Sequence, residues 1–186
     1  WYYGPQERLL AAYDLNKSDE SSFFQKIHFG INYQAIEESR VSRRFNSNYR
    51  DSRIENVGIV GGAFDIHRKS EKNVVRVGID FQYNDLTSTA NRKDIVADTV
   101  AKLDTRYPDG NNTLLTTGIY LSHSFQISEN LLLTDGLRVG YSYLKSTFID
   151  TAFFHFPFSD ANQQQPLYSG SLGLINTPSD DLKLSV

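Results

Sequence analysis

The sequence predicts an all-β fold, an antiparallel up-and-down meander of about eight strands that forms a segment of a transmembrane β-barrel. Apolar and polar residues alternate with period 2 in at least four segments, most cleanly from Val75 to Tyr83. The connections between such segments are alternately short and long. Several segments also exceed the usual strand length of about 5–6 residues and reach the roughly 9–11 that a tilted membrane strand requires.

The composition narrows the class of protein. The chain has 186 residues, enough for one domain, and its net charge of −3 gives no attraction to nucleic acid. Cysteine is absent, which excludes disulfides, Cys-ligated zinc and Cys nucleophiles together. No run of 18 apolar residues occurs, so a transmembrane helix is excluded. The sequence lacks methionine, opens on Trp1 and ends within an apparent strand, so we expect a piece of a longer protein.

The alternating segments divide the chain into eight predicted strands. Their approximate bounds are 6–15, 23–36, 53–67, 74–86, 114–127, 131–148, 167–175 and 182 onward. The third strand is the least regular, because Gly58, Gly61 and Gly62 interrupt it, and these glycines predict a bulge or bend. Apolar residues at near-helical spacing in 93–103 predict a short helix within a loop.

The connections fall into two classes. Short turns follow the first, third, fifth and seventh strands, whereas long connections of about 37–52, 87–113 and 149–166 follow the second, fourth and sixth. Successive antiparallel strands place alternate connections at opposite ends of a sheet. The short turns therefore gather at one end and the long loops at the other, which is the plan of outer-membrane barrels.

Aromatic residues at the strand ends favour a barrel in lipid over a soluble fold. Aromatics near the long-loop end and near the short-turn end predict two interfacial girdles. The first set is Tyr33, Tyr83, Tyr141 and Tyr143, and the second is Tyr13, Phe23 and Phe125. The opposite face mixes glycine with Arg76, Asp80 and Arg138, as a wet lumen would. His123 and Asp135 oppose this interpretation, because they occupy the lipid-facing register and are tolerable only near an interface.

A soluble alternative stays open. A β-sandwich or small closed β-barrel would hide the apolar face in a core and act as a small-molecule binding module. The tyrosines would then be ordinary strand formers.

Three segments, Tyr3–Ala11, Val77–Asp85 and Thr105–Gly110, resemble parts of the barrel of TonB-dependent outer-membrane receptors of the Bacteroidetes type. The strand and turn spacing is similar along nearly all of the chain. The resemblance implies an N-terminal plug inside a barrel of about 22 strands. Residues 1–186 would then be a partial barrel domain, roughly a third of the whole, that lacks the plug, the TonB box and the closing strand.

The resemblance also implies a function and a location. The protein would lie in the cell outer membrane and import a scarce nutrient, such as an iron chelate, haem, a cobalamin or a glycan. Its partners would be outer-membrane lipid, the nutrient, and TonB through the missing plug. We expect no enzymatic activity, no resident cofactor and no nucleic-acid partner.

The most unusual loop is 153–158, in which four of six residues are phenylalanine. Leaving these side chains in water is costly, so we expect them to pack against other apolar surface. The candidate ligand-binding residues are Phe153, Phe154, His155, Phe156 and Phe158, together with Tyr107 of the second long loop. In one interpretation they form a lip that captures ligand or contacts the plug, with His155 as a haem ligand. In the simpler one, the loop packs on itself at the rim.

Other constellations predict no catalytic or metal site. Asp65 and His67 alternate on one strand beside a short turn, with no nucleophile nearby. Residues 104–112 contain Asp and Asn side chains without EF-hand spacing, and a solvated turn accounts for them. The charge run 37–44 is predicted to be a solvated loop face, with anion binding by its arginines as the second option. Those arginines are Arg40, Arg43 and Arg44.

Overall fold

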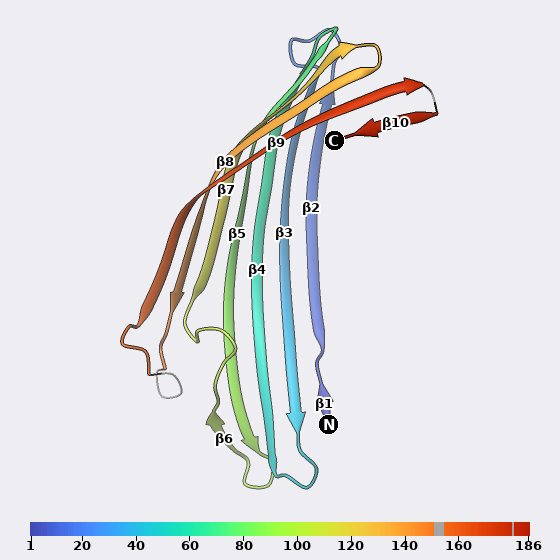
Figure 1. Ribbon diagram of the computed structural model, residues 1–186. Helices are drawn as coiled ribbons and strands as arrows, with labels where there is room; N and C mark the ends of the chain where they lie inside the picture. The colour runs from blue at the N-terminus through green and yellow to red at the C-terminus, as the bar shows by residue number, and fades with distance from the viewer. Residues whose placement is uncertain (151–154, 180) are drawn as a thin grey trace.

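The computed structural model describes residues 1–150, 155–179 and 181–186, which form one ten-stranded sheet (Figure 1). Every recorded strand pair is antiparallel. The strands are β1 (Tyr2–Tyr3), β2 (Gln6–Ser18), β3 (Lys26–Arg43), β4 (Tyr49–Lys69), β5 (Asn73–Asp94), β6 (Thr99–Lys102), β7 (Asn112–Ser128), β8 (Leu131–Thr147), β9 (Asp160–Ser179) and β10 (Leu182–Ser185). The predicted all-β meander is confirmed: the eight predicted strands correspond to β2–β5 and β7–β10, and β1 and β6 are short additions.

Several strands run past their predicted ends. β3 continues to Arg43, β4 begins at Tyr49 and β5 continues to Asp94, so two of the predicted long loops are largely strand. The charge run 37–44, predicted as a loop face, lies mostly in β3. Polar residues do not end these strands because their charges find partners across the sheet. Arg92 of β5, for example, lies 2.6 Å from Asp51 of β4.

The helix predicted within 93–103 is wrong, because this segment forms the end of β5, a turn and β6. The turn is closed by Asp94 Oδ1, which accepts the backbone N–H groups of Val96 (2.9 Å) and Ala97 (3.1 Å). Asp98 supplies the left-handed residue of the turn, with φ of 55°. β-Branched Thr99 and Val100 then favour a strand. Among the described residues, the structure contains no helix long and apolar enough to cross a membrane.

The bulge predicted at the β4 glycines is also wrong. β4 pairs with β3 and β5 without a register shift. The glycines instead make room for side chains of neighbouring strands: a Cβ on Gly62 would lie 2.6 Å from the Phe81 ring, and one on Gly61 3.0 Å from the Asn32 amide. Register shifts occur elsewhere, in the β7–β8 pair and the β9–β10 pair.

Apolar side chains gather on one face of the sheet, called here the outward face. One row of directly paired residues is apolar on seven strands, namely Leu15, Phe29, Phe64, Ile79, Ile119, Val139 and Tyr168. Their exposed fractions run from 39% to 74%. Within the described residues no hydrophobic side chain is buried, whereas Glu55, Asp65 and Ser88 are. This distribution is the reverse of that in a water-soluble domain.

The apolar region of the outward face is a band of limited height. Polar residues replace apolar ones at its long-loop edge, including Glu7, Glu37 and Asp85. At the other edge His123 Nδ1 lies 3.0 Å from Asp135 Oδ2, so these two opposing residues satisfy each other. About ten residues of β5 span the band, or roughly 34 Å of strand. At the tilt of about 35–45° that strands adopt in outer-membrane barrels, this length would span roughly 24–28 Å.

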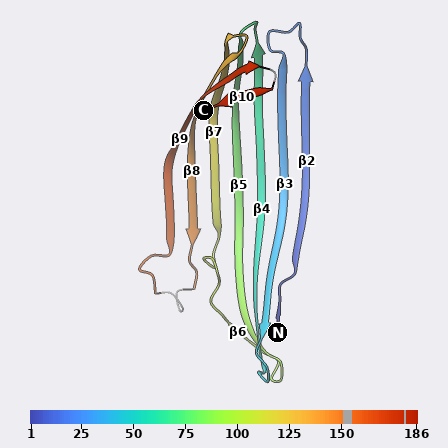
Figure 2. The same cartoon turned by 45° about the vertical axis from the view of Figure 1, so that its right-hand side comes forward.

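The connections separate by end, as Figures 1 and 2 show. Turns 19–25, 70–72 and 129–130 lie at one end, and residues 44–48, 95–98, 103–111, 148–150 and 155–159 lie at the other. At the long-loop edge of the band, Tyr33, Tyr83 and Tyr143 share one cross-strand row. The placement of Tyr13 in the short-turn girdle is wrong. Because β2 continues to Ser18, Tyr13 lies in the row of Phe81.

Candidate functional site

The face opposite the apolar band, called here the inner face, carries a charged network centred on Asp65 of β4. Asp65 is fully buried. Its carboxylate lies 3.0 Å from His28 Nδ1 and 2.8 Å from His67 Nε2. Arg76 donates two hydrogen bonds to it, at 3.1 and 3.0 Å, and the Tyr120 hydroxyl donates one at 3.3 Å. The partners come from β3, β4, β5 and β7, so the network ties four strands together.

Asp65 and His67, for which the sequence predicts no catalytic role, belong to this network. The two side chains do meet, but both carboxylate oxygens of Asp65 already accept hydrogen bonds from several donors. A carboxylate saturated in this way holds its neighbours in place and is poorly suited to act as a base.

Glycines on the inner face let long side chains lie flat across the strands. Arg138 of β8 reaches Asp80 of β5 with two hydrogen bonds, at 3.2 and 2.6 Å. It crosses β7 at Gly118, where a Cβ would lie 2.5 Å from the guanidinium. The predicted clustering of Arg76, Asp80 and Arg138 on one wet face therefore agrees with the structure.

At the long-loop end, two connections enclose adjoining cavities. The first is polar, measures about 200 Å³ and is lined by Ser88, Thr89, Ala90, Lys102, Leu103, Asp104, Thr105, Asp109 and Asp150. The second is aromatic, measures about 190 Å³ and is lined by Thr105, Arg106, Tyr107, Pro108, Asp109, Phe148, Asp150 and Phe156. Thr105, Asp109 and Asp150 line both, so the two cavities together offer an amphipathic surface.

Backbone hydrogen bonds clamp these two connections together. Asp109 accepts the N–H groups of Ile149 and Asp150, each at 2.9 Å. Gly110 donates its N–H to the Thr147 carbonyl at 3.0 Å. A Cβ on Gly110 would lie 2.5 Å from that carbonyl oxygen, so this close approach requires glycine.

The structure brings together two of the predicted ligand-binding residues. Tyr107 and Phe156 line the same aromatic cavity, although they belong to different loops. The Phe156 ring also packs on Phe148 and Phe158, each with centroids 5.2 Å apart. The described phenylalanines of the loop, Phe156 and Phe158, thus pack on each other, and Phe156 also lines the cavity. The ligand-capturing and the self-packed interpretations of the loop both stay predictions.

The remaining predicted residues are placed differently. His155 is exposed, and its role as a haem ligand stays a prediction. Phe153 and Phe154 lie outside the described residues. Within the residues described, no group of three or more His, Asp or Glu side chains is placed to hold a metal ion. Sequence reasoning missed Phe148 and Asp150, because nothing in a single sequence indicates which two loops will touch.

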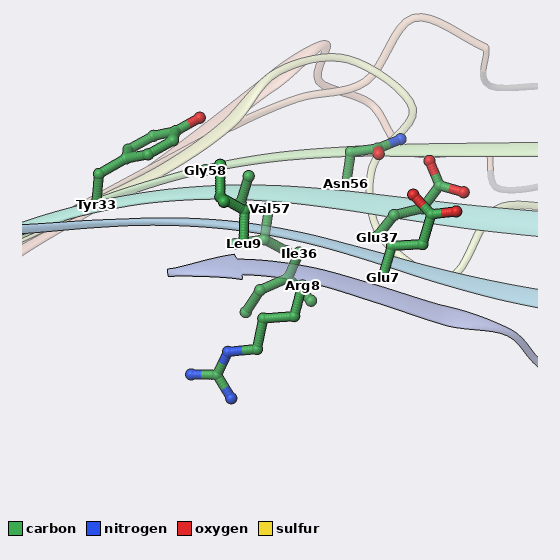
Figure 3. A pocket seen from close by; sticks show the side chains of 10 residues that line it. Glu7, Arg8, Leu9, Tyr33, Ile36, Glu37, Asn56, Val57 and Gly58 are labelled. Carbon is green, nitrogen blue, oxygen red and sulfur yellow. The ribbon is translucent and has the colours of Figure 1, made fainter. Parts of the chain in front are cut away.

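A further shallow cavity of about 420 Å³ lies on the outward face where the apolar band ends (Figure 3). A Cβ on Gly58 would meet nothing within 4 Å, so the missing side chain helps to form the hollow. Figure 3 also shows the alternation of faces, because Arg8 points away from Tyr33 and Glu37.

Comparison with solved structures finds the same fold in parts of three larger proteins. No protein-family model and no curated protein matches the chain. Among solved structures, the copper transporter OprC matches with a TM-score of 0.80 and 16% identity, over 95% of this chain and 29% of that one. The ferric citrate transporter FecA in its unliganded form matches with a TM-score of 0.66 and 14% identity, over 96% and 26%. The siderophore receptor PiuA from Acinetobacter baumannii matches with a TM-score of 0.65 and 13% identity, over 95% and 31%.

These identities are low, so the likeness shows the fold. This chain spans between 26% and 31% of the length of the three matched chains. All three are described as transporters or receptors. The predicted all-β antiparallel meander is thereby confirmed, and it has the fold of part of each of these three barrels.

Proposed function

We propose that this chain is part of the barrel wall of an outer-membrane receptor that imports a scarce nutrient in a TonB-dependent manner. One observation supports it above the others: a single sheet carries an exposed apolar band on one face and charged networks on the other. The likeness to two transporters and a siderophore receptor adds to it. Residues 1–186 would be a partial barrel domain, coupled to TonB through an N-terminal plug elsewhere in the protein.

The soluble binding-module alternative fits less well, because it needs a covered apolar face. Val77, Ile79 and Phe81 are 39%, 46% and 40% exposed. The described strands form one sheet, and no second layer packs on that face. Lipid supplies the cover that a second sheet would otherwise provide.

The two ends of the sheet suit different tasks in such a receptor. The long-loop end holds the polar and aromatic cavities, so we assign it to nutrient capture outside the cell. The charged inner face, with Asp65 and Asp80 at its centre, forms the wet wall of the lumen. The nutrient would be an iron chelate, haem, a cobalamin or a glycan.

A deletion strain tests the proposal. We expect loss of the full-length protein to reduce the accumulation of one nutrient, tested among radiolabelled ferric chelates, haem, cobalamin and oligosaccharides under limitation. Loss of TonB should reduce accumulation of the same nutrient to the same level. Recovery of the protein in the soluble fraction, or accumulation that does not depend on TonB, would contradict the proposal.

A further inference from the structure

A buried carboxylate on the inner face lacks a hydrogen-bond partner. Glu55 of β4 is 4% exposed, and neither of its carboxylate oxygens has such a partner within the described residues. Ser88, its directly paired neighbour on β5, is 2% exposed, and its hydroxyl has none either. Burying polar groups in this state is costly, and most of all for a charge. The pair therefore favours an occupant that can donate hydrogen bonds and carry positive charge.

The cation beside Glu55 is Arg106, which belongs to the connection between β6 and β7. Its Nη1 lies 3.9 Å from Glu55 Oε2 and 3.7 Å from Glu38 Oε1. These are ion-pair distances, but they are too long for hydrogen bonds. Glu38 is also held by Arg40, so its charge is balanced without Arg106. Within the described residues, Arg106 is the one ion-pair partner of Glu55.

Arg106 is placed so that it can leave. Its side chain is 36% exposed, so the guanidinium can turn toward solvent while hydrogen bonds at Asp109 and Gly110 hold the connection in place. We propose that Glu55, with Glu38 and Ser88, forms a subsite for an organic cation, an ammonium or guanidinium group of the ligand, and that Arg106 occupies this subsite when ligand is absent. This inference rests on the proposed function, because the ligand is the imported nutrient.

The chemistry around the subsite favours a cation that is free to move. An untethered ammonium or guanidinium group can approach a carboxylate to about 2.7–2.9 Å and make charge-assisted hydrogen bonds. Ser88, the direct cross-strand partner of Glu55, also lines the polar cavity of about 200 Å³, so the cavity lies beside the subsite. The cavity lining carries three carboxylates (Asp104, Asp109 and Asp150) and one ammonium group (Lys102). Lys102 pairs with Asp150, and Arg53 pairs with Asp104 from outside the lining. The carboxylates still outnumber these cations, which favours a cationic ligand over an anionic one.

Binding of agmatine tests the inference, because agmatine carries a guanidinium and an ammonium group. Isothermal titration calorimetry on the purified full-length protein in detergent gives the Kd. Arg106→Gln removes the tethered competitor. If Arg106 fills the subsite about 90% of the time, its removal lowers the apparent Kd about tenfold. A gain in affinity cannot come from misfolding.

Glu55→Gln should weaken agmatine binding at least about tenfold. In the double variant, Arg106→Gln should no longer raise the affinity for agmatine.

Two controls make the result specific. Lys93→Gln breaks the ion pair of Lys93 with Asp98, away from the subsite, and should leave agmatine affinity unchanged. Citrate should not gain affinity when Arg106 is replaced. Equal agmatine affinity in the wild type and Arg106→Gln, no binding by either, or an equal gain for citrate would overturn the subsite. If the subsite is overturned but the protein still imports its nutrient, the proposed receptor function is unaffected. If the receptor function itself is wrong, nutrient accumulation in the deletion strain is unchanged.

Discussion

At the residue scale, Asp65 occupies the kind of buried, central position that an apolar side chain such as leucine holds in a soluble domain. It is fully buried, but its neighbours are Arg76 and two histidines in place of hydrocarbon. A charge in that position stabilises the fold only while its partners stay matched to it. The inner face is therefore sensitive to changes that preserve shape but remove charge.

Replacing Asp65 by Asn tests this sensitivity. The side chain keeps its size, but Arg76 loses its counter-charge and His28 and His67 lose an anionic acceptor. We expect the free energy of unfolding to fall by roughly 1.5–3 kcal/mol, because hydrogen bonds to a charged group are lost while the part-exposed Arg76 stays solvated. The urea midpoint of unfolding in detergent, followed by far-UV circular dichroism, measures it.

Asp14→Asn is the matched control for Asp65→Asn. Asp14 lies 3.1 Å from the other ring nitrogen of His28, but its side chain is 62% exposed. Its loss should change stability by less than about 1 kcal/mol. If the two variants lose equal stability, Asp65 is not the centre of the network.

At the element scale, β4 and β5 continue beyond the apolar band because charged pairs hold them together. Asp51 and Arg92 form a bidentate pair there, at 2.6 and 2.8 Å. Hydrogen bonds from Arg92 hold the pKa of Asp51 below its ordinary value of 3.8. Because the pKa of Asp51 is lower in the folded state, the pair stabilises the extension in full when the solution pH is above the ordinary pKa. The contribution is lost as the pH falls below 3.8 through the folded-state pKa.

Hydrogen exchange measures this loss. We expect the backbone amides of 49–54 and 89–94 to be more protected at pH 6 than at about pH 3, once intrinsic exchange rates are corrected for. The Asp51→Asn variant should already show reduced protection at pH 6 and little further loss at low pH. Equal protection of the wild type at both pH values would show that the pair does not hold the extension.

The elements also show how far a single sequence can predict this fold. Alternation within β5 placed Arg76 and Asp80 on one face correctly, because a period of 2 is a local property of the strand. The strand extensions could not be predicted in this way. Polar residues at 37–43 and 87–94 look like loop until their cross-strand partners are known.

The candidate site was predicted only in part for the same reason. Tyr107 and Phe156 were recognised as unusual loop residues, but their shared cavity depends on hydrogen bonds that Asp109 accepts from the backbone of the other loop. Glu55 looked like one more polar strand residue. Its burial follows from the loop that carries Arg106, a contact between segments far apart in the sequence.

At the scale of the whole molecule, the cross-strand rows turn local alternation into a continuous surface. The row through Phe29, Ile79 and Val139 is apolar on every strand from β2 to β9 that it crosses. A slip of one residue in any pair would move charges onto that face, so the need to keep the face apolar selects the register. The outward face therefore behaves as one unit, and its tolerance of charge should depend on depth.

Ile79→Arg tests that dependence, because Ile79 lies near the middle of the band on the outward face. We expect a loss of about 2–4 kcal/mol in folding into lipid, since an arginine at mid-depth is poorly solvated. The fraction of folded, heat-modifiable protein in phospholipid vesicles, titrated with urea, measures it.

Two variants serve as controls. Thr87→Arg, on the same face beyond the long-loop edge, should cost at most about 1 kcal/mol. Gln82→Arg, on the inner face of the same strand, should cost little because it meets water. If Gln82→Arg and Ile79→Arg destabilise equally, depth and face do not matter, and lipid does not cover the apolar band.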